Sequence, residues 1–104
     1  MKKNITRIAT PLYYASREGL FTPVSLLLEK GADVNAQGGY YGNALQAAST
    51  EGNEAIVALL LEKGADINAQ GGAYGNALQA ASVGGHEAIV ALLLEKEART
   101  KNIA

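Results

Sequence analysis

His86 is the residue whose type most readily suggests chemistry, because a histidine can act as a general base or bind a metal ion. It is the single histidine in a chain of 104 residues. The residue 33 positions earlier, within a nearly identical stretch of sequence, is Asn53. An asparagine would not preserve catalysis or metal binding, but both side chains can accept a hydrogen bond at the start of a helix. We therefore expect Asn53 and His86 to be helix N-caps.

Two further patterns could in principle bind a ligand: the glycine pairs at 38–39 and 71–72, and the acidic residues Asp33 and Asp66. A P-loop needs Lys and then Ser or Thr after its second glycine, and neither pair has them. Turns that require positive φ account for these glycines. A metal site needs ligands from three or more directions, which the pattern does not supply. We expect both aspartates to accept backbone hydrogen bonds in the turn after a helix.

No other combination of residues in the sequence predicts a reaction centre. The chain has no cysteine, and it contains no Ser–His–Asp set, no paired carboxylates and no Cys/His cluster. We therefore expect that the protein is not an enzyme. We also expect no catalytic, cofactor-binding or metal-binding residues.

The charge and the hydropathy pattern argue against nucleic acid and membrane partners. Nine basic and ten acidic residues give a net charge of −1, which offers no basis for attraction to nucleic acid or an anionic membrane. The longest apolar run, AIVALLL, is far too short to span a bilayer. No continuous apolar stretch follows the two lysines near the start, so we expect no signal peptide and an intracellular, cytoplasmic location.

Three tyrosines lie in the glycine-rich segments, where loops project and structural constraints are low. Tyr41 and Tyr74 are separated by 33 residues, so they are equivalent, and we expect them to pack between neighbouring loop tips. Tyr40 instead aligns with Ala73 and Arg7. A position that changes while its surroundings are copied is a candidate for recognition, and tyrosine is enriched at binding hot spots.

Sequence repeats must position all of these residues. NALQAAS occurs at 43–49 and 76–82, and EAIVALLLEK occurs at 54–63 and 87–96, both with an offset of 33 residues. A fixed period of this size is typical of stacked repeats. The alignment divides a single domain of residues 1–104 into a lead and three repeats: 1–9, 10–42, 43–75 and 76–104.

Each repeat reads as two helices and a loop. In the second repeat, Asn43 can cap a short helix that Gly52 ends, and Asn53 can cap the next helix. Gly64 is placed for a left-handed C-cap, whereas Glu97 replaces it in the third repeat, so the last helix must end differently or continue. The second helix carries a broad apolar stripe, formed by Ile56, Val57, Leu60 and Leu61. Two short helices cannot bury such stripes alone, so the stacking of repeats forms the core.

These motifs resemble the ankyrin-repeat family. TPLYYAS in the first repeat is similar to the ankyrin signature T-P-L-H-x-A. The sequence GxxxxVxLLLEKGADVNA at 19–36, with its echo at 52–69, resembles the ankyrin second helix and the entry to its hairpin. The near-identical repeats resemble the ankyrin arrays of large fungal proteins. The resemblance implies an all-α ankyrin-repeat solenoid of three 33-residue helix-turn-helix units joined by β-hairpin-like loops.

The sequence departs from the family pattern at several positions. Thr-Pro becomes Asn-Ala at 43–44 and 76–77. Tyr13, Gln46 and Gln79 take the place of the motif histidine. The usual hairpin tip is replaced by GGYYGN and GGAYGN.

The resemblance implies a non-catalytic module that binds a protein partner through its loop tips and the concave face of its first helices. Carried over to this sequence, the partner-binding surface comprises Arg7, Tyr14, Arg17, Glu18, Tyr40, Thr50, Glu51, Ala73 and Val83. The partner itself is not identified by the sequence. The alternative is a structural or self-assembling segment of a repeat array, excised or designed, with no dedicated ligand. The near-identity of the second and third repeats favours recent duplication or consensus construction.

The third repeat has no following repeat to cover its second helix. Val90 and Leu94 are the candidates for an uncovered stripe, while their counterparts Val57 and Leu61 are expected to be buried between repeats. Such a patch predicts weak end-to-end association between copies, with a symmetric dimer as the favoured closed form.

Overall fold

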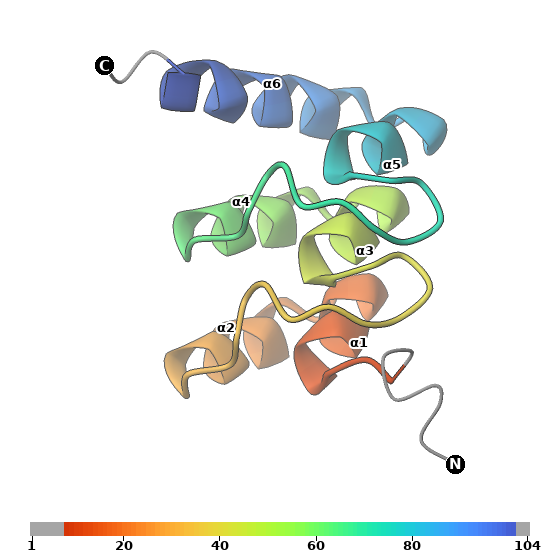
Figure 1. Cartoon of the computed structure of the whole chain (residues 1–104). Coiled ribbons are helices and arrows are strands. Elements are labelled where there is room, and N and C mark those ends of the chain that lie inside the picture. The colour runs from red at the N-terminus through yellow and green to blue at the C-terminus, as the bar shows by residue number, and fades with distance from the viewer. Residues whose placement is uncertain (1–7, 102–104) are drawn as a thin grey trace.

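The computed structural model describes residues 8–101, and in this range the chain forms three helix pairs. The helices are α1 (Pro11–Glu18), α2 (Phe21–Glu29), α3 (Ala44–Glu51), α4 (Glu54–Glu62), α5 (Ala77–Val83) and α6 (Glu87–Lys101). Figure 1 shows two layers, with α1, α3 and α5 stacked in one layer and α2, α4 and α6 in the other. The predicted all-α fold of stacked helix pairs is confirmed.

Local chemistry sets the start and end of the first helix in each pair. Thr10, Asn43 and Asn76 are N-caps, and each side chain accepts a hydrogen bond from the backbone N–H three residues later, at 3.1, 2.9 and 2.8 Å. Gly19 and Gly52 follow α1 and α3 in the left-handed region, with φ of 79° and 80°. Both ends therefore use the residue types that the backbone conformation favours.

The second helices end as the sequence predicts. Gly64 has a φ of 98° and lies one residue beyond the C-cap Lys63 of α4, so the left-handed position falls on the expected glycine. In the third repeat, Glu97 offers no such stop, and α6 continues to Lys101, giving 15 residues where α4 has 9.

A single main cluster of buried side chains runs through the three repeats. Its largest members include Leu12, Val24, Leu45, Val57, Leu60, Ile89 and Leu93. α3 packs against both α1 and α5, and α4 packs against both α2 and α6. Val57 is fully buried as expected, whereas Leu61, which was expected to be buried, is half-buried and packs against the cluster. The stacking of repeats therefore forms the core.

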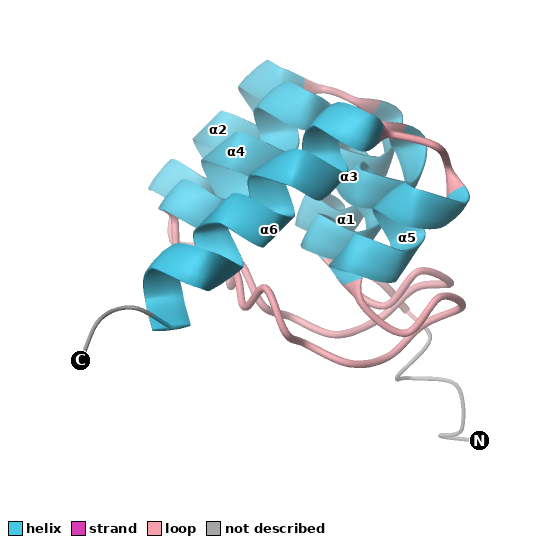
Figure 2. Cartoon of the chain, turned by 90° about the horizontal axis from the view of Figure 1, so that it is seen from above, coloured by secondary structure: helices cyan, strands magenta, loops and turns pink. Residues whose placement is uncertain are grey.

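The loops between helix pairs extend together on one side of the helix layers (Figure 2). In each of the two loops, a backbone hydrogen bond closes the tip: Gly38 N–H donates to the Gly42 carbonyl at 2.8 Å, and Gly71 N–H donates to that of Gly75 at 2.9 Å. Earlier in the loops, Asp33 and Asp66 accept hydrogen bonds from the backbone N–H two residues later, both at 2.9 Å. The predicted role of the two aspartates in the turn is confirmed.

Candidate binding surface

The residues predicted to contact a partner are mostly accessible in the structure. Arg7 lies outside the described residues. Arg17 and Thr50 are half-buried. The exposed members of the predicted surface are Tyr14, Glu18, Tyr40, Glu51, Ala73 and Val83. The loop tips and the ends of α1 and α3 therefore supply most of the accessible side chains.

Tyrosines of neighbouring loop tips pack against each other. The rings of Tyr41 and Tyr74 are stacked, with centroids 6.1 Å apart and an angle of 17° between planes. Tyr40 meets the ring of Tyr41 edge to face at 5.2 Å, and its backbone carbonyl accepts a hydrogen bond from Ala73 N–H at 3.0 Å. The expected packing of Tyr41 on Tyr74 is confirmed, while Tyr40 keeps 73% of its surface exposed. We call Tyr40, Tyr41 and Tyr74 the tyrosine surface.

The tyrosine surface is anchored to the first helices. The Tyr13 hydroxyl accepts a hydrogen bond from Tyr41 N–H at 3.0 Å, and the Tyr41 hydroxyl donates to a Glu51 carboxylate oxygen at 3.3 Å. Burial, followed by the negative charge of Glu51, raises the pKa of the Tyr41 hydroxyl. Tyr41 is therefore held as a neutral donor between the loop tip and α3.

A second aromatic group lies at the end of α1. The guanidinium of Arg17 lies over the ring of Tyr14, 5.3 Å from its centroid, and Tyr13 meets Tyr14 edge to face. Arg17 also donates to one carboxylate oxygen of Glu18, at 3.1 and 2.9 Å. This hydrogen bond raises the pKa of Arg17. Its charge is already balanced by Glu18, so Arg17 shapes the surface around Tyr14 more than it offers a positive charge to a ligand.

Thr50 has a structural contact of its own. Its hydroxyl donates to the Gln46 carbonyl one helical turn earlier, at 2.8 Å. The hydroxyl of Thr50 is thus used in a hydrogen bond within α3. Its counterpart on α5 is Val83, which is exposed.

The structure corrects the expectation that Asn53 and His86 cap helices with their side chains. Asn53 stands at the start of α4, but its side chain makes no capping hydrogen bond. Its Nδ2 instead donates to the carbonyls of Ser16 and Arg17 in the preceding repeat, at 2.8 and 3.3 Å. His86 lies next to the start of α6, and its Nε2 is 2.9 Å from the Thr50 carbonyl, again in the preceding repeat. Because the partner is a carbonyl, this nitrogen must carry the proton.

Glycine makes these hydrogen bonds between repeats possible. A Cβ atom on Gly19 would lie 3.2 Å from the Asn53 side chain, and one on Gly52 would lie 2.6 Å from the His86 ring. The two side chains therefore fill the space left by a glycine at the end of the preceding first helix. The exchange of Asn for His between repeats was the sequence signal for this contact. Both the amide and the imidazole provide an N–H donor, and this is the property used here.

Gln46 links the first helix of the second repeat to the loop that ends the same repeat. The side chain is buried, and its Nε2 donates to the carbonyls of Gly71 and Gly75, at 2.9 and 3.3 Å. Its equivalent in the third repeat, Gln79, is exposed. Tyr13 and Gln46, at the position of the family's motif histidine, thus each form a hydrogen bond with the loop that ends their own repeat.

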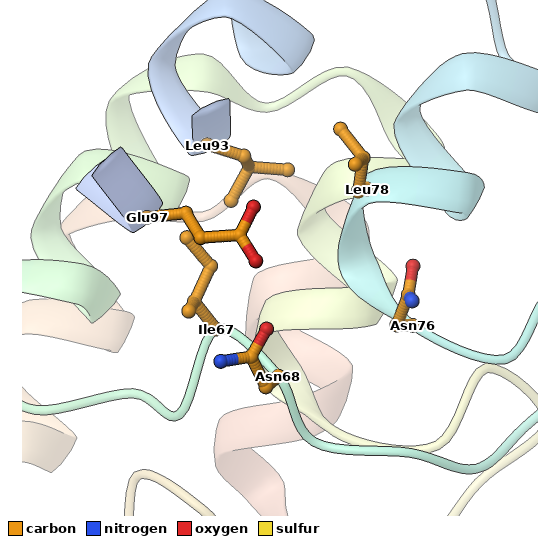
Figure 3. A pocket seen from close by; sticks show the side chains of 6 residues that line it. All are labelled: Ile67, Asn68, Asn76, Leu78, Leu93 and Glu97. Atoms are coloured by element: carbon orange, nitrogen blue, oxygen red, sulfur yellow. The ribbon is translucent and has the colours of Figure 1, made fainter. Parts of the chain in front are cut away.

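The small cavity between α6 and the preceding loop is too small for a cofactor. The cavity in Figure 3 has a volume of about 50 Å³ and lies where Glu97 and Leu93 of α6 face Ile67 and Leu78. Drug-sized ligands and cofactors occupy about 300–1,000 Å³. Within residues 8–101, no group of three His, Cys, Asp or Glu side chains could hold a metal ion. No helix in the same range is long and apolar enough to cross a membrane.

Two comparisons with known proteins are informative. A family model described as ankyrin repeats in three copies matches residues 2–71 and 40–103. Over 54 residues the chain is 49% identical to the azaphilone pigments biosynthesis cluster protein L of Monascus ruber. That match covers 45% of this chain and 11% of the relative, so the chain corresponds to a small part of that protein.

Proposed function

This chain belongs to the ankyrin-repeat family, and we propose that it is a non-catalytic module that binds a protein partner through its loop tips and first helices. Ankyrin repeats generally act in protein interactions. The observation that supports this use of the surface is the exposure of Tyr40 on a rigid support of stacked rings. A preorganised aromatic side chain contributes binding energy at a low cost in conformational entropy.

The charges around the tyrosines favour a partner segment that is apolar or carries a positive charge. Glu51 and Glu18 are both exposed, and the Tyr41 hydroxyl and Arg17 contact them. A lysine or arginine of the partner would lie against the face of Tyr40 while it pairs with Glu51, because Glu18 already pairs with Arg17. An acidic segment would instead meet like charges.

Selection of binders from a displayed library of protein fragments would test this proposal. We expect saturable one-to-one binding, with Tyr40→Ala lowering the affinity by about 30-fold, as for a hot-spot residue. Lys63→Ala, at the far end of α4 from the loop tips, is the matched control and should leave the affinity unchanged. Binders that tolerate both Tyr40→Ala and Tyr14→Ala would contradict the proposed surface.

A structural role in a larger repeat assembly is the second candidate. It is supported by Leu94, which is 47% exposed on α6 although its counterpart Leu61 is half-buried in the stack. Measurements of association in solution distinguish the two candidate functions. Association that rises with concentration, without any selectable partner, would favour the structural role, whereas a saturable partner and no such association would favour the binding module.

A further inference from the structure

The outer face of α6 exposes side chains that the equivalent helices bury. Val57 is fully buried within the stack, whereas its counterpart Val90 is half-buried. Leu28 and Leu61 are half-buried, but Leu94 is 47% exposed. In Figure 1, α6 lies at one end of the row formed by α2, α4 and α6. Val90 and Leu94 therefore belong to the face that each repeat presents to the repeat after it.

The opposite end of the stack exposes the complementary face. Leu59 and Leu92 are half-buried, while their counterpart Leu26 on α2 is 48% exposed. In the same way Ile56 is buried, and its counterpart Pro23 is exposed. Side chains at these two positions are more exposed in the first repeat than in the second and third. Leu26 and Pro23 therefore belong to the face that each repeat presents to the repeat before it.

A hollow at the α6 end corresponds to a space that is filled between the repeats. The space beside Gly19 is filled by Asn53, and the space beside Gly52 is filled by His86. Gly85 is the equivalent of both glycines in the third repeat. A Cβ atom built on Gly85 would have no atom within 4 Å. Gly85 lines a hollow of about 420 Å³ together with Ser82, Val90 and Leu94. The C-terminal hollow is thus shaped for the residue that precedes a second helix.

We propose that the two ends of this chain bind each other between copies, head to tail. In the first repeat, Leu20 takes the place of Asn53 and His86 and is 48% exposed. Leu20 of one copy enters the C-terminal hollow of the next, and Leu26 packs against Leu94. The contact repeats the packing of α4 on α6. Leu20 cannot donate to a helix-end carbonyl, so the contact between copies is weaker than the contact between repeats.

The sequence favours a symmetric dimer as the closed form. The same structural features make that arrangement less suitable than the head-to-tail contact. Pairing two α6 ends would place one C-terminal hollow against another, with no side chain to fill either. A head-to-tail contact joins two different surfaces and does not close, so it produces chains of increasing length. The tyrosine surface takes no part in it, and partner binding through that surface is independent of this association.

Complementary variants test the proposal. We expect the sedimentation coefficient of the unmodified protein to rise continuously with concentration up to the millimolar range. Leu26→Gln disrupts the contact surface at the α2 end, and Leu94→Gln disrupts the surface at the α6 end. Each variant alone should therefore be a monomer. An equimolar mixture retains one intact pair of ends and should form a dimer that grows no further. Ala58→Gln, exposed on α4 in the middle repeat, is the matched control and should associate like the unmodified protein.

The outcomes that overturn the proposal are distinct. A strictly monomeric unmodified protein at millimolar concentration excludes it. Association that Leu94→Gln abolishes but Leu26→Gln leaves unchanged indicates the symmetric dimer instead. Helicity and melting temperature are compared for every variant. If Leu26→Gln unfolds, Leu20→Asp replaces it, because aspartate is a preferred residue before a helix and places a charge at the same end; association of Leu20→Asp at the unmodified level also refutes the head-to-tail contact.

Discussion

Replacing Asn53 with aspartate separates the two roles that this residue could have. The change exchanges one amide group for a carboxylate of the same shape. As an N-cap, aspartate is as good as asparagine, and its charge favours the positive end of the α4 dipole. As a donor to the carbonyls of Ser16 and Arg17, aspartate fails completely, because an ionised carboxylate only accepts hydrogen bonds. The two roles therefore predict effects of opposite sign.

The expected loss of stability follows from the contacts of Asn53. The bond to the Ser16 carbonyl at 2.8 Å is the stronger, and the bond to Arg17 at 3.3 Å adds little. Losing this donor costs about 1–3 kcal/mol, and the Ser16 carbonyl then keeps only the longer hydrogen bond from Gly19 N–H at 3.4 Å. The added charge at the helix start returns about 0.3–1 kcal/mol. The net result is a loss of roughly 0.5–2 kcal/mol for the Ser16 contact.

Urea unfolding followed by circular dichroism would measure this difference. His86→Asn is the matched control, because it places the same amide donor at the next contact between repeats and should cost less than Asn53→Asp. An increase in the midpoint for Asn53→Asp, or no change at all, would show that the side chain acts as a cap and that its hydrogen bonds to the preceding repeat contribute nothing.

Three further changes test the packing and the electrostatics. Gly64→Val should cost about 1–2 kcal/mol and Lys63→Ala much less, because a β-branched residue is strained at a φ of 98°, and equal urea midpoints would contradict this. The raised pKa of Tyr41 means that the folded state holds this proton more tightly, so its contribution is complete below pH 10 and is lost as the pH rises through the folded pKa. Tyr41→Phe should reduce that alkaline loss in unfolding experiments, and an unchanged pH profile would assign it to other groups. A chain of residues 1–75 should melt well below the full chain, and an equal melting temperature would mean that stacking on the third repeat adds no stability.

Local chemistry was sufficient to predict where most helices begin and end. Asn43 and Asn76 carry an acceptor that the first turn needs, and Gly52 and Gly64 tolerate positive φ where the helices stop. These features depend on a few neighbouring residues, so they can be recognised in the sequence. The continuation of α6 follows in the same way from Glu97, which replaces the glycine.

Contacts between repeats were not predictable from a single repeat. The sequence indicates that Asn53 and His86 lie at helix starts, but not that a carbonyl of the preceding repeat lies within reach of their side chains. Leu61 likewise belongs to the apolar stripe, yet the position of α6 leaves it only half-buried. Both outcomes depend on the offset between neighbouring helix pairs, which the period of the sequence does not specify.

Copied and varied positions therefore have different roles in this chain. Copied apolar residues such as Val57 lie in the buried cluster that joins the repeats, and we propose that their counterparts at the exposed ends join two copies. Under the proposed function, partner specificity comes from positions that differ between the repeats. Arg17-Glu18, Thr50-Glu51 and Val83-Gly84 are equivalent dipeptides with different chemistry, and Tyr40 is replaced by Ala73 one repeat later. All of them lie at the ends of first helices or in loop tips, next to the tyrosine surface or in line with it, and none belongs to the main buried cluster. Their variation should have little effect on the stability of the stack, so we propose that these positions determine partner specificity.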